Sequence, residues 1–495
     1  MPEIKPLRWR WLDWTLVSTA TIVAGVLRFH ALDRKPFWLD EGVSVAISRL
    51  DWYNFIRLMW RREANMSLYY VLLRGWQHLG GSEFFLRSLS VVFAVATVPA
   101  IYWLGLRLFD RRVATIASFI FALNAYSIRY AQEARSYSLY VFLGTLSWIF
   151  FIEYIRNSSA RLRRAFICFS ALAVYAHLYF AFFIVAQWIV ARLYDRKAMP
   201  PAMTAAFRWI GAITFPAFLF AATTGVGPLR WVQRPGISDV YGYYDHMAGN
   251  GGPWLVAACF IAIVLALQPV IRTVTSRDSC WGTWRFQLLI LWMFFPTALV
   301  LLLSLARPLF VPRYLIACQA AFLVLVAAGV CRLSRTWAQV AVVAFLAILS
   351  LRGTLAYYDH DFDLDREDYR SATRYLIEHA APGDVVVFDI AQGRMPYEFY
   401  RSVYGSPGVA PRVIYPSIAD RLDYRDFMGR ATPDVIRGAR EPAERVWMVR
   451  KTNAGASDSD VQQLSDALSK DYPTVENRAF AGVELRLYSS GARLR

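Results

Sequence analysis

Long apolar stretches without charge recur along the first two thirds of the chain. Charged residues bracket each stretch, and most approach the roughly 17–25 residues that a helix needs to cross a bilayer. A soluble core does not repeat this pattern so often, so we predict a polytopic α-helical membrane protein. The stretches cover residues 14–27, 88–106, 113–128, 136–152, 165–191, 209–229, 253–271, 286–306, 314–331 and 336–351.

The stretch 165–191 decides the number of crossings. Basic residues flank both of its ends, at Arg164 and Arg192, and a single crossing would put them on opposite sides of the membrane. Because cytosolic loops carry the excess of Lys and Arg, we expect two short helices here, broken near residues 176–179. The chain would then have about eleven transmembrane helices, with the N-terminus in the cytosol and the C-terminus outside.

The loops expected outside the membrane are unequal in length. The first outer loop, residues 29–87, contains an apolar stretch at 66–76 that is too short to span and is more typical of an interfacial or re-entrant segment. Residues 230–252 are rich in Gly, Tyr and Trp and have the size of a flap. We therefore expect the functional site on this outer side.

After Gly353 the composition changes, so we divide the chain into a transmembrane module (1–353) and a soluble extracytoplasmic domain (354–495). Alternating aspartates, Asp359 to Asp365, open this domain. An EF-hand would need Gly and Glu where Arg366 and Ala372 stand, so a solvated linker is the better interpretation. Helices and strands alternate beyond it, which predicts a small α/β domain. The expected helices are 369–380 and 458–468, and the expected strands are 384–388, 412–415, 445–450 and 483–488.

Composition and charge support this interpretation. The chain is 57% hydrophobic and 18% charged, against ~25% charged in an ordinary soluble protein. The net charge of +17 falls mainly at helix ends, where it sets topology, and no nucleic-acid-binding motif accompanies it. No P-loop or dinucleotide fingerprint occurs in the membrane part, so a nucleotide donor is not expected. The five cysteines show neither metal-ligand spacing nor a disulfide framework.

Three polar groups on the outer side are candidates for chemistry. Asp40 and Glu41 follow an aromatic pair after the first apolar stretch, where carboxylates are costly to dehydrate; the alternative is an interfacial helix cap. The second group offers a carboxylate, a guanidinium and a phenol, or else an interfacial salt bridge. The third offers an arginine that holds a phosphate or anchors a helix end. These two groups are Glu133, Arg135 and Tyr137, and Arg313 with Tyr314.

His177 is alone in the expected apolar hairpin, and such a histidine is more often packed or hydrogen-bonded than catalytic. Carboxylates and arginines on one side of a membrane nevertheless suit chemistry on a phosphate-linked substrate. They do not identify the reaction.

At these residues the chain resembles the GT-C superfamily of polyprenyl-phosphate-sugar glycosyltransferases. It is most similar to bacterial relatives of the dolichyl-phosphate-mannose–protein mannosyltransferases (glycosyltransferase family 39). The resemblance covers roughly residues 10–350, and its motifs occur in the family's order. They are Trp38-Leu39-Asp40-Glu41, Leu68-Tyr69-Tyr70, Ser82-Glu83-Phe84 through Arg87, Leu104-Gly105 to Arg112, Tyr130 to Tyr137 and Pro312-Arg313-Tyr314.

The resemblance implies a hexosyl- or pentosyltransferase of the cell envelope, in the cytoplasmic (inner) membrane. Its donor would be a polyprenyl-phosphate-linked sugar, and its acceptor a hydroxyl on a protein, glycolipid or polysaccharide. Asp40 would be the base of an inverting displacement and Glu41 its neighbouring acid. Some members use a divalent metal, and the sequence leaves that open. The expected substrate-binding residues are Tyr69, Tyr70, Glu133, Arg135, Tyr137, His177, Arg313 and Tyr314.

Two other functions compete with this interpretation. A transporter or flippase of lipid-linked intermediates would need charged or broken helices at mid-membrane and internal repeats. The apolar stretches are largely free of charge, and no repeat relates the two halves. A non-catalytic membrane scaffold would leave the acidic and arginine clusters on the outer side unexplained.

Overall fold

The computed structural model describes residues 9–194, 199–224, 232–273, 281–360, 366–405, 410–417, 429–434, 443–452 and 458–490. The chain forms two compact units. We call Met1–Leu32, Asn65–Tyr69 and Arg87–Asp359 the helical unit, and Asp33–Ala64, Tyr70–Leu86 and His360–Arg495 the mixed unit. Most of the loop at residues 29–87, predicted to lie outside the membrane, thus groups with the C-terminal segment.

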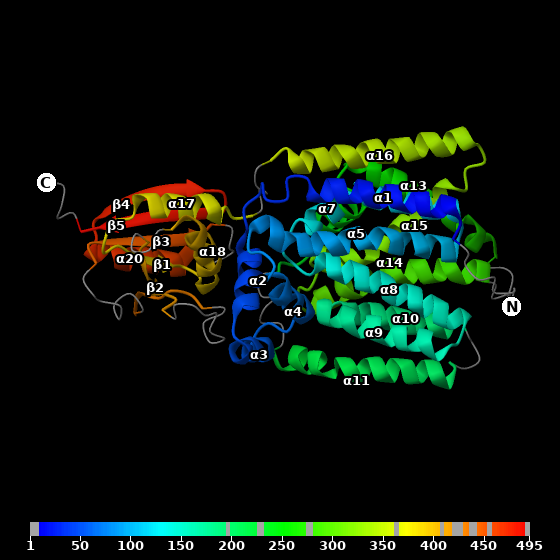
Figure 1. The fold of residues 1–495 in the computed structure, drawn as a ribbon, viewed down its shortest axis with the longest axis horizontal. Helices are drawn as coiled ribbons and strands as arrows, with labels where there is room; N and C mark the ends of the chain where they lie inside the picture. The colour runs from blue at the N-terminus through cyan, green and yellow to red at the C-terminus, as the bar shows by residue number, and fades with distance from the viewer. Residues whose placement is uncertain are drawn as a thin grey trace. The chain divides into compact units, whose positions relative to one another are not determined.

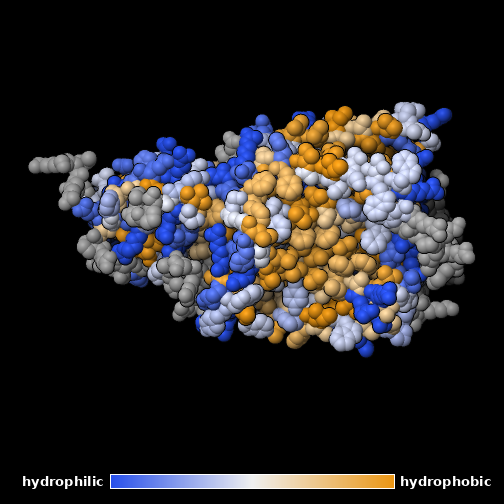
Figure 2. All heavy atoms as spheres, in the orientation of Figure 1, coloured by the Kyte–Doolittle hydropathy of each residue, from blue (hydrophilic) through white to orange (hydrophobic). Residues whose placement is uncertain are grey.

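Long helices lie side by side in the helical unit (Figure 1). Large apolar side chains such as Ile22, Trp209 and Val340 are exposed on them, and hydrophobic residues gather over the face of this unit that Figure 2 shows. An exposed apolar surface on helices long enough to span a bilayer is typical of a protein that faces lipid. The helices are α1 (Trp11–Phe29), α5 (Glu83–Leu108), α6 (Arg111–Leu123), α7 (Ala125–Ala131), α8 (Tyr137–Arg156), α9 (Ala160–Ala176), α10 (Phe180–Tyr194), α11 (Pro201–Thr224), α12 (Ile237–Ala248), α13 (Pro253–Thr273), α14 (Trp281–Ala306), the 3-10 helix η2 (Pro312–Cys318), α15 (Gln319–Val330) and α16 (Thr336–Tyr358).

The chain is a multi-pass membrane protein, but the expected number of about eleven spans is not confirmed. In the described part of the chain, seven helices are long and apolar enough to cross a membrane, or eight if α12 and α13, bent by 77°, count as one span. The number is lower because α6, α9 and α10 have only 13, 17 and 15 residues.

The structure agrees with the prediction for residues 165–191 and differs from it for residues 230–252. The predicted break between two short helices is confirmed, since α9 ends at Ala176 and α10 begins at Phe180. The loop expected at 230–252 is instead largely helical, because α12 occupies Ile237–Ala248 and buries Tyr243 and Met247. The prediction of a loop relied on glycines, but Gly236 and Gly249 lie at the two ends of α12 and do not interrupt it.

Arg28 caps a neighbouring helix. Its side chain is fully buried, and it donates to the carbonyls of Phe121 (3.0 Å) and Ala122 (3.0 Å), in the last turn of α6, and to Ser127 Oγ (2.7 Å). A cation at a helix C-terminus satisfies carbonyls that lack partners and opposes the helix dipole. The charge therefore ties α1 to α6.

Helices α13 and α15 approach closely at Gly329. A Cβ atom built on Gly329 would overlap the carbonyl group of Ala262 on α13. Without a hydrophobic driving force between helices in lipid, small residues at such crossings provide the van der Waals contact that holds them. Glycine is therefore required here by space rather than by backbone conformation.

A five-stranded sheet forms the centre of the mixed unit, in the order β2-β1-β3-β5-β4. β1 pairs in parallel with β2 and β3, and β5 pairs antiparallel with β3 and β4. The four predicted strands and both predicted helices are present, whereas β4 and α18 were missed. The elements are α17 (Tyr369–His379), β1 (Val385–Phe388), α18 (Arg394–Tyr404), β2 (Arg412–Tyr415), β3 (Arg445–Lys451), α20 (Asp458–Asp471), β4 (Thr474–Phe480) and β5 (Val483–Ser489).

Both faces of the sheet are covered, which explains the continuous apolar run of β1. Val385 and Val387 pack with Leu464 of α20, while Phe388, on the other face, contacts Tyr397 of α18. The Asp368 side chain caps α17 by accepting from the Ser371 N–H at 3.0 Å. This cap agrees with the interpretation of the preceding segment as a linker into a helix. Asp361, Asp363 and Asp365 lie outside the described residues.

The loop between α1 and α5 forms three helices. They are α2 (Leu39–Arg49), α3 (Trp52–Arg61) and α4 (Ser67–Trp76). Within the mixed unit, α2 packs against α18, and a Cβ atom on Gly42 would lie 2.7 Å from Pro396 Cβ. A glycine at this point lets the two helices come into contact.

Candidate functional site

The candidate carboxylates begin helix α2. The chain is extended at Trp38, and Asp40 and Glu41 fall in the first helical turn, where the helix dipole stabilises negative charge. Neighbouring helical residues project about 100° apart, and the two side chains accordingly differ in exposure. Glu41 is fully buried, whereas Asp40 is partly exposed. Asp40 is therefore the carboxylate that a substrate can reach more readily.

In the helical unit, a turn between α7 and α8 carries Arg135. Gln132, which follows α7, anchors the turn by donating from Nε2 to the Arg28 carbonyl at 3.0 Å. Ser90 Oγ donates to the Arg135 carbonyl at 3.1 Å and lies 2.8 Å from Tyr69 Oη. Tyr69, predicted to bind substrate, thus supports the backbone of Arg135.

His177 lies at the break between α9 and α10, surrounded by tyrosines. Its ring centroid is 4.7 Å from that of Tyr314, 5.0 Å from that of Tyr140 and 6.2 Å from that of Tyr137. The guanidinium carbon of Arg313 lies 5.5 Å from the ring centroid of Tyr314. The fold therefore brings together residues predicted from three separate sequence motifs.

The protonation of His177 follows from its surroundings. Burial and the positive charges of Arg135 and Arg313 lower the pKa of His177 to about 3. Its Nδ1 accepts a hydrogen bond from the Tyr179 N–H at 3.3 Å, so the neutral ring carries its proton on Nε2. His177 thus presents a neutral N–H donor, and the arginines carry the charge.

Three buried polar atoms here have no hydrogen-bond partner among the described residues: Tyr126 Oη, Tyr137 Oη and His177 Nε2. Tyr126 also interacts electrostatically with Arg313. A buried donor without an acceptor costs about 1–3 kcal/mol, so ligand oxygen atoms would remove this cost. We call Arg135, Tyr137, His177, Arg313 and Tyr314, together with Tyr126, the cationic cluster.

The other predicted site residues have different surroundings. Glu133 is buried and forms an ion pair with Arg129 (3.9 Å), an arginine one helical turn before it that the sequence analysis did not single out. Tyr70 belongs to the mixed unit, where its hydroxyl donates to Glu63 at 3.4 Å. Both contacts give these residues a structural role within their own unit.

Sequence reasoning missed Tyr126, Arg129 and Tyr140. Tyr126 and Tyr130 are one helical turn apart, and their rings lie 5.0 Å from each other. A tyrosine repeat beside otherwise apolar stretches was the available signal, because a buried phenol needs a polar partner.

The predicted site residues are divided between the two units. Asp40, Glu41 and Tyr70 belong to the mixed unit, and Tyr69, Glu133 and the cationic cluster belong to the helical unit. Within the described ranges, no group of three or more His, Cys, Asp or Glu side chains could hold a metal ion.

The fold and the cluster define a class: a multi-pass membrane protein with a buried arginine, Arg135, in the turn between α7 and α8 and a partly buried one, Arg313, at the start of η2. No protein-family model matches the sequence, and no curated protein matches it either. Solved structures with the GT-C glycosyltransferase fold do match, so the predicted fold is confirmed.

Two of these structures show the extent of the likeness. ArnT from Cupriavidus metallidurans, bound to undecaprenyl phosphate, superposes with a TM-score of 0.60 at 12% identity over 98% of this chain and 99% of that chain. The archaeal oligosaccharyltransferase AglB from Archaeoglobus fulgidus, in complex with an inhibitory peptide and a dolichol-phosphate, gives a TM-score of 0.54 at 12% identity. That match covers 98% of this chain and 75% of AglB.

Proposed function

We propose that this protein is a membrane glycosyltransferase that moves a sugar from a polyprenyl-phosphate donor to an acceptor hydroxyl on the extracytoplasmic side. The observation that carries the proposal is the cationic cluster, with two arginines and three buried polar atoms that have no hydrogen-bond partner among the described residues. A phosphate supplies the negative charge and the acceptor oxygens that this cluster needs. The apolar helices suit a polyprenyl chain.

The structural neighbours support this choice of donor. ArnT was solved with undecaprenyl phosphate and AglB with a dolichol-phosphate. By analogy of fold, the lipid phosphate of this protein would bind Arg135 and Arg313, with hydrogen bonds from His177 Nε2 and Tyr137 Oη. The sugar would be a hexose or a pentose, and the acceptor a protein, glycolipid or polysaccharide.

The proposed reaction is a single displacement. The acceptor oxygen attacks the anomeric carbon, the bond from that carbon to the phosphate oxygen breaks, and polyprenyl phosphate leaves with the electron pair. The two arginines stabilise the charge that develops on the phosphate. Asp40 accepts the proton of the acceptor hydroxyl, and the configuration at the anomeric carbon inverts.

The proposal is tested with purified protein in nanodiscs and undecaprenyl-phosphate-linked hexoses and pentoses, by measuring the release of undecaprenyl phosphate in the presence of cell-envelope acceptors. Donor-dependent release supports it. Transport of intact donor across the bilayer without release would instead identify a flippase.

Replacing either arginine by lysine is expected to impair transfer although the charge is kept. Arg135→Lys or Arg313→Lys loses the planar fork of donors that binds two phosphate oxygens. Loss of one charge-assisted hydrogen bond costs about 1.5–3 kcal/mol, so we expect kcat/KM for the donor to fall roughly ten- to hundredfold. Arg208→Lys, at an exposed position on α11, is the control. Unchanged kinetics in both variants would show that these arginines do not bind the donor.

The orientation is also testable. If the N-terminus lies in the cytosol, a cysteine introduced at Arg161–Arg164 should be labelled from the cytosolic side of the inner membrane. A tag placed after Arg495 should be labelled from the outer side. The reason is the clustering of basic residues in the expected inner loops. Impermeant cysteine-directed reagents on single-cysteine variants make the measurement. Labelling of the C-terminal tag from the cytosol would reverse the proposed sidedness.

A further inference from the structure

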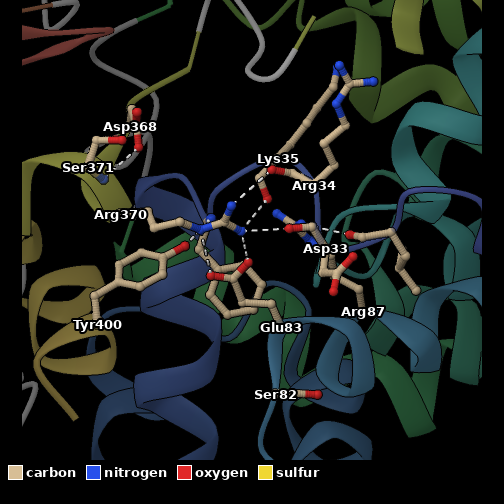
Figure 3. A network of polar contacts seen from close by, with 12 residues as sticks. Asp33, Arg34, Lys35, Ser82, Glu83, Arg87, Asp368, Arg370, Ser371 and Tyr400 are labelled. Carbon is tan, nitrogen blue, oxygen red and sulfur yellow. Dashed lines mark hydrogen bonds and ion pairs between the residues drawn. The ribbon is translucent and has the colours of Figure 1, made fainter. Parts of the chain in front are cut away.

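An arginine from the C-terminal segment holds the backbone that leads to Asp40. Arg370, on α17, donates to the carbonyls of Asp33 (2.7 Å), Arg34 (2.9 Å) and Lys35 (3.2 Å) and forms an ion pair with Glu83. Figure 3 shows its guanidinium reaching these groups. All of these residues belong to the mixed unit.

Two more side chains hold the same stretch closer to Asp40. Tyr400 Oη, on α18, accepts a hydrogen bond from the Phe37 N–H at 2.6 Å. Glu367 Oε2 accepts one from the Leu39 N–H at 3.1 Å, and Glu367 Oε1 lies 2.8 Å from Lys451 Nζ. Glu367 is almost fully buried and ion-paired, so its geometry is well defined.

These contacts fall on a segment that has no helix or strand to fix it. Residues 33–38 precede α2, and their backbone groups need partners from elsewhere. Side chains of residues 367–400 bind this backbone at five positions between Asp33 and Leu39. These bonds hold the backbone that leads directly into the first turn of α2, which carries Asp40.

We propose that Arg370, Tyr400 and Glu367 are positioning residues of the active site, which fix segment 33–39 so that Asp40 meets the acceptor hydroxyl. The inference rests on the role proposed for Asp40. It makes the C-terminal segment part of the catalytic apparatus instead of an accessory domain.

The test compares variants with matched controls on the same helices. Arg370→Ala should lower kcat by up to about 10²-fold, the penalty of misplacing a reacting group by roughly 1 Å, with little change in donor KM. Arg374→Ala is its control, because Arg374 is exposed and forms its ion pair with Glu378, one turn away on α17. Tyr400→Phe, which removes one hydroxyl, should lower kcat about fivefold. Tyr404→Phe, one turn further along α18, should not.

Two readouts separate positioning from general damage to the fold. In an Asp40→Asn background, Arg370→Ala should have little further effect, because the residue through which it acts is already disabled. Loss of folded enzyme would lower the residual activity by the same factor in both backgrounds. Amide hydrogen exchange over residues 33–39 should rise in Arg370→Ala and Tyr400→Phe and stay unchanged in the controls.

The outcomes distinguish this inference from the proposed function. If the wild-type protein transfers no sugar, the proposed function is wrong, and the exchange comparison still decides whether these side chains hold the segment. If wild type transfers, Asp40→Asn does not, and Arg370→Ala and Tyr400→Phe match wild type in kcat and exchange, the inference alone is overturned. Equal losses in both backgrounds also overturn it.

Discussion

Turnover of an Asp40→Asn variant is expected to fall by ~10²–10⁴-fold, the usual contribution of a general base. Asparagine keeps the size and shape of the side chain but accepts no proton. Binding of the donor should be largely retained, because the lost interaction matters in the transition state. Steady-state kinetics of the purified variant in nanodiscs, with undecaprenyl phosphate binding measured separately, make the comparison. Near-wild-type turnover would show that Asp40 is not the general base.

Glu41 and the stereochemistry of the product complete this test. Glu41 is fully buried one residue away, so Glu41→Gln should lower turnover less than Asp40→Asn does. A single displacement with one base inverts the anomeric centre, whereas a carboxylate nucleophile would retain it. NMR of the product decides between them, and retention would contradict the mechanism.

The largest expected effect on stability is at Gly329. A methyl group there overlaps the Ala262 carbonyl, a backbone group that can move only if α13 and α15 separate. Overpacking typically costs ~1–3 kcal/mol, and a backbone obstacle places Gly329→Ala at or above the upper end of that range. We expect a lower melting temperature and a smaller monodisperse fraction in detergent.

Gly211→Ala is the matched control for this substitution. It places the same methyl group on helix α11, where nothing lies within 4 Å. Alanine is favoured over glycine in a helix by roughly 0.5–1 kcal/mol, so this variant should be as stable as wild type or more so. Equal melting temperatures for the two variants would show that the α13–α15 contact relaxes without cost.

Sequence patterns predicted the features with strong local signals. The break at His177, the alternation of the C-terminal strands and the membrane character all follow from periodicity and charge. The pattern failed for β4, where six of the seven residues are exposed and no alternation marks the strand. It also failed for α18, where Gly393 precedes the helix and Pro396 falls in its first turn, a position that tolerates proline.

The candidate site was only partly predictable, for a physical reason. The members of the cationic cluster other than Tyr126 were named individually from the sequence. Sequence spacing could not show that rings more than a hundred residues apart, such as those of His177 and Tyr314, lie 4.7 Å from each other. The contacts of Arg370 with backbone carbonyls are harder still to foresee. They depend on the path of the main chain and leave no pattern in residue type.

The mixed unit is discontinuous in sequence, and this affects how it is synthesised. Its early segments end at Leu86 and the remainder begins at His360, 274 positions later (360 − 86). At ~5–20 residues per second, translation of the intervening residues takes about 15–55 s. During that time α2 already exists, while α18, against which it packs, has not yet been made. A nascent chain stalled before residue 360 therefore exposes the α18-binding face of α2, which a chaperone or a quality-control protease can recognise.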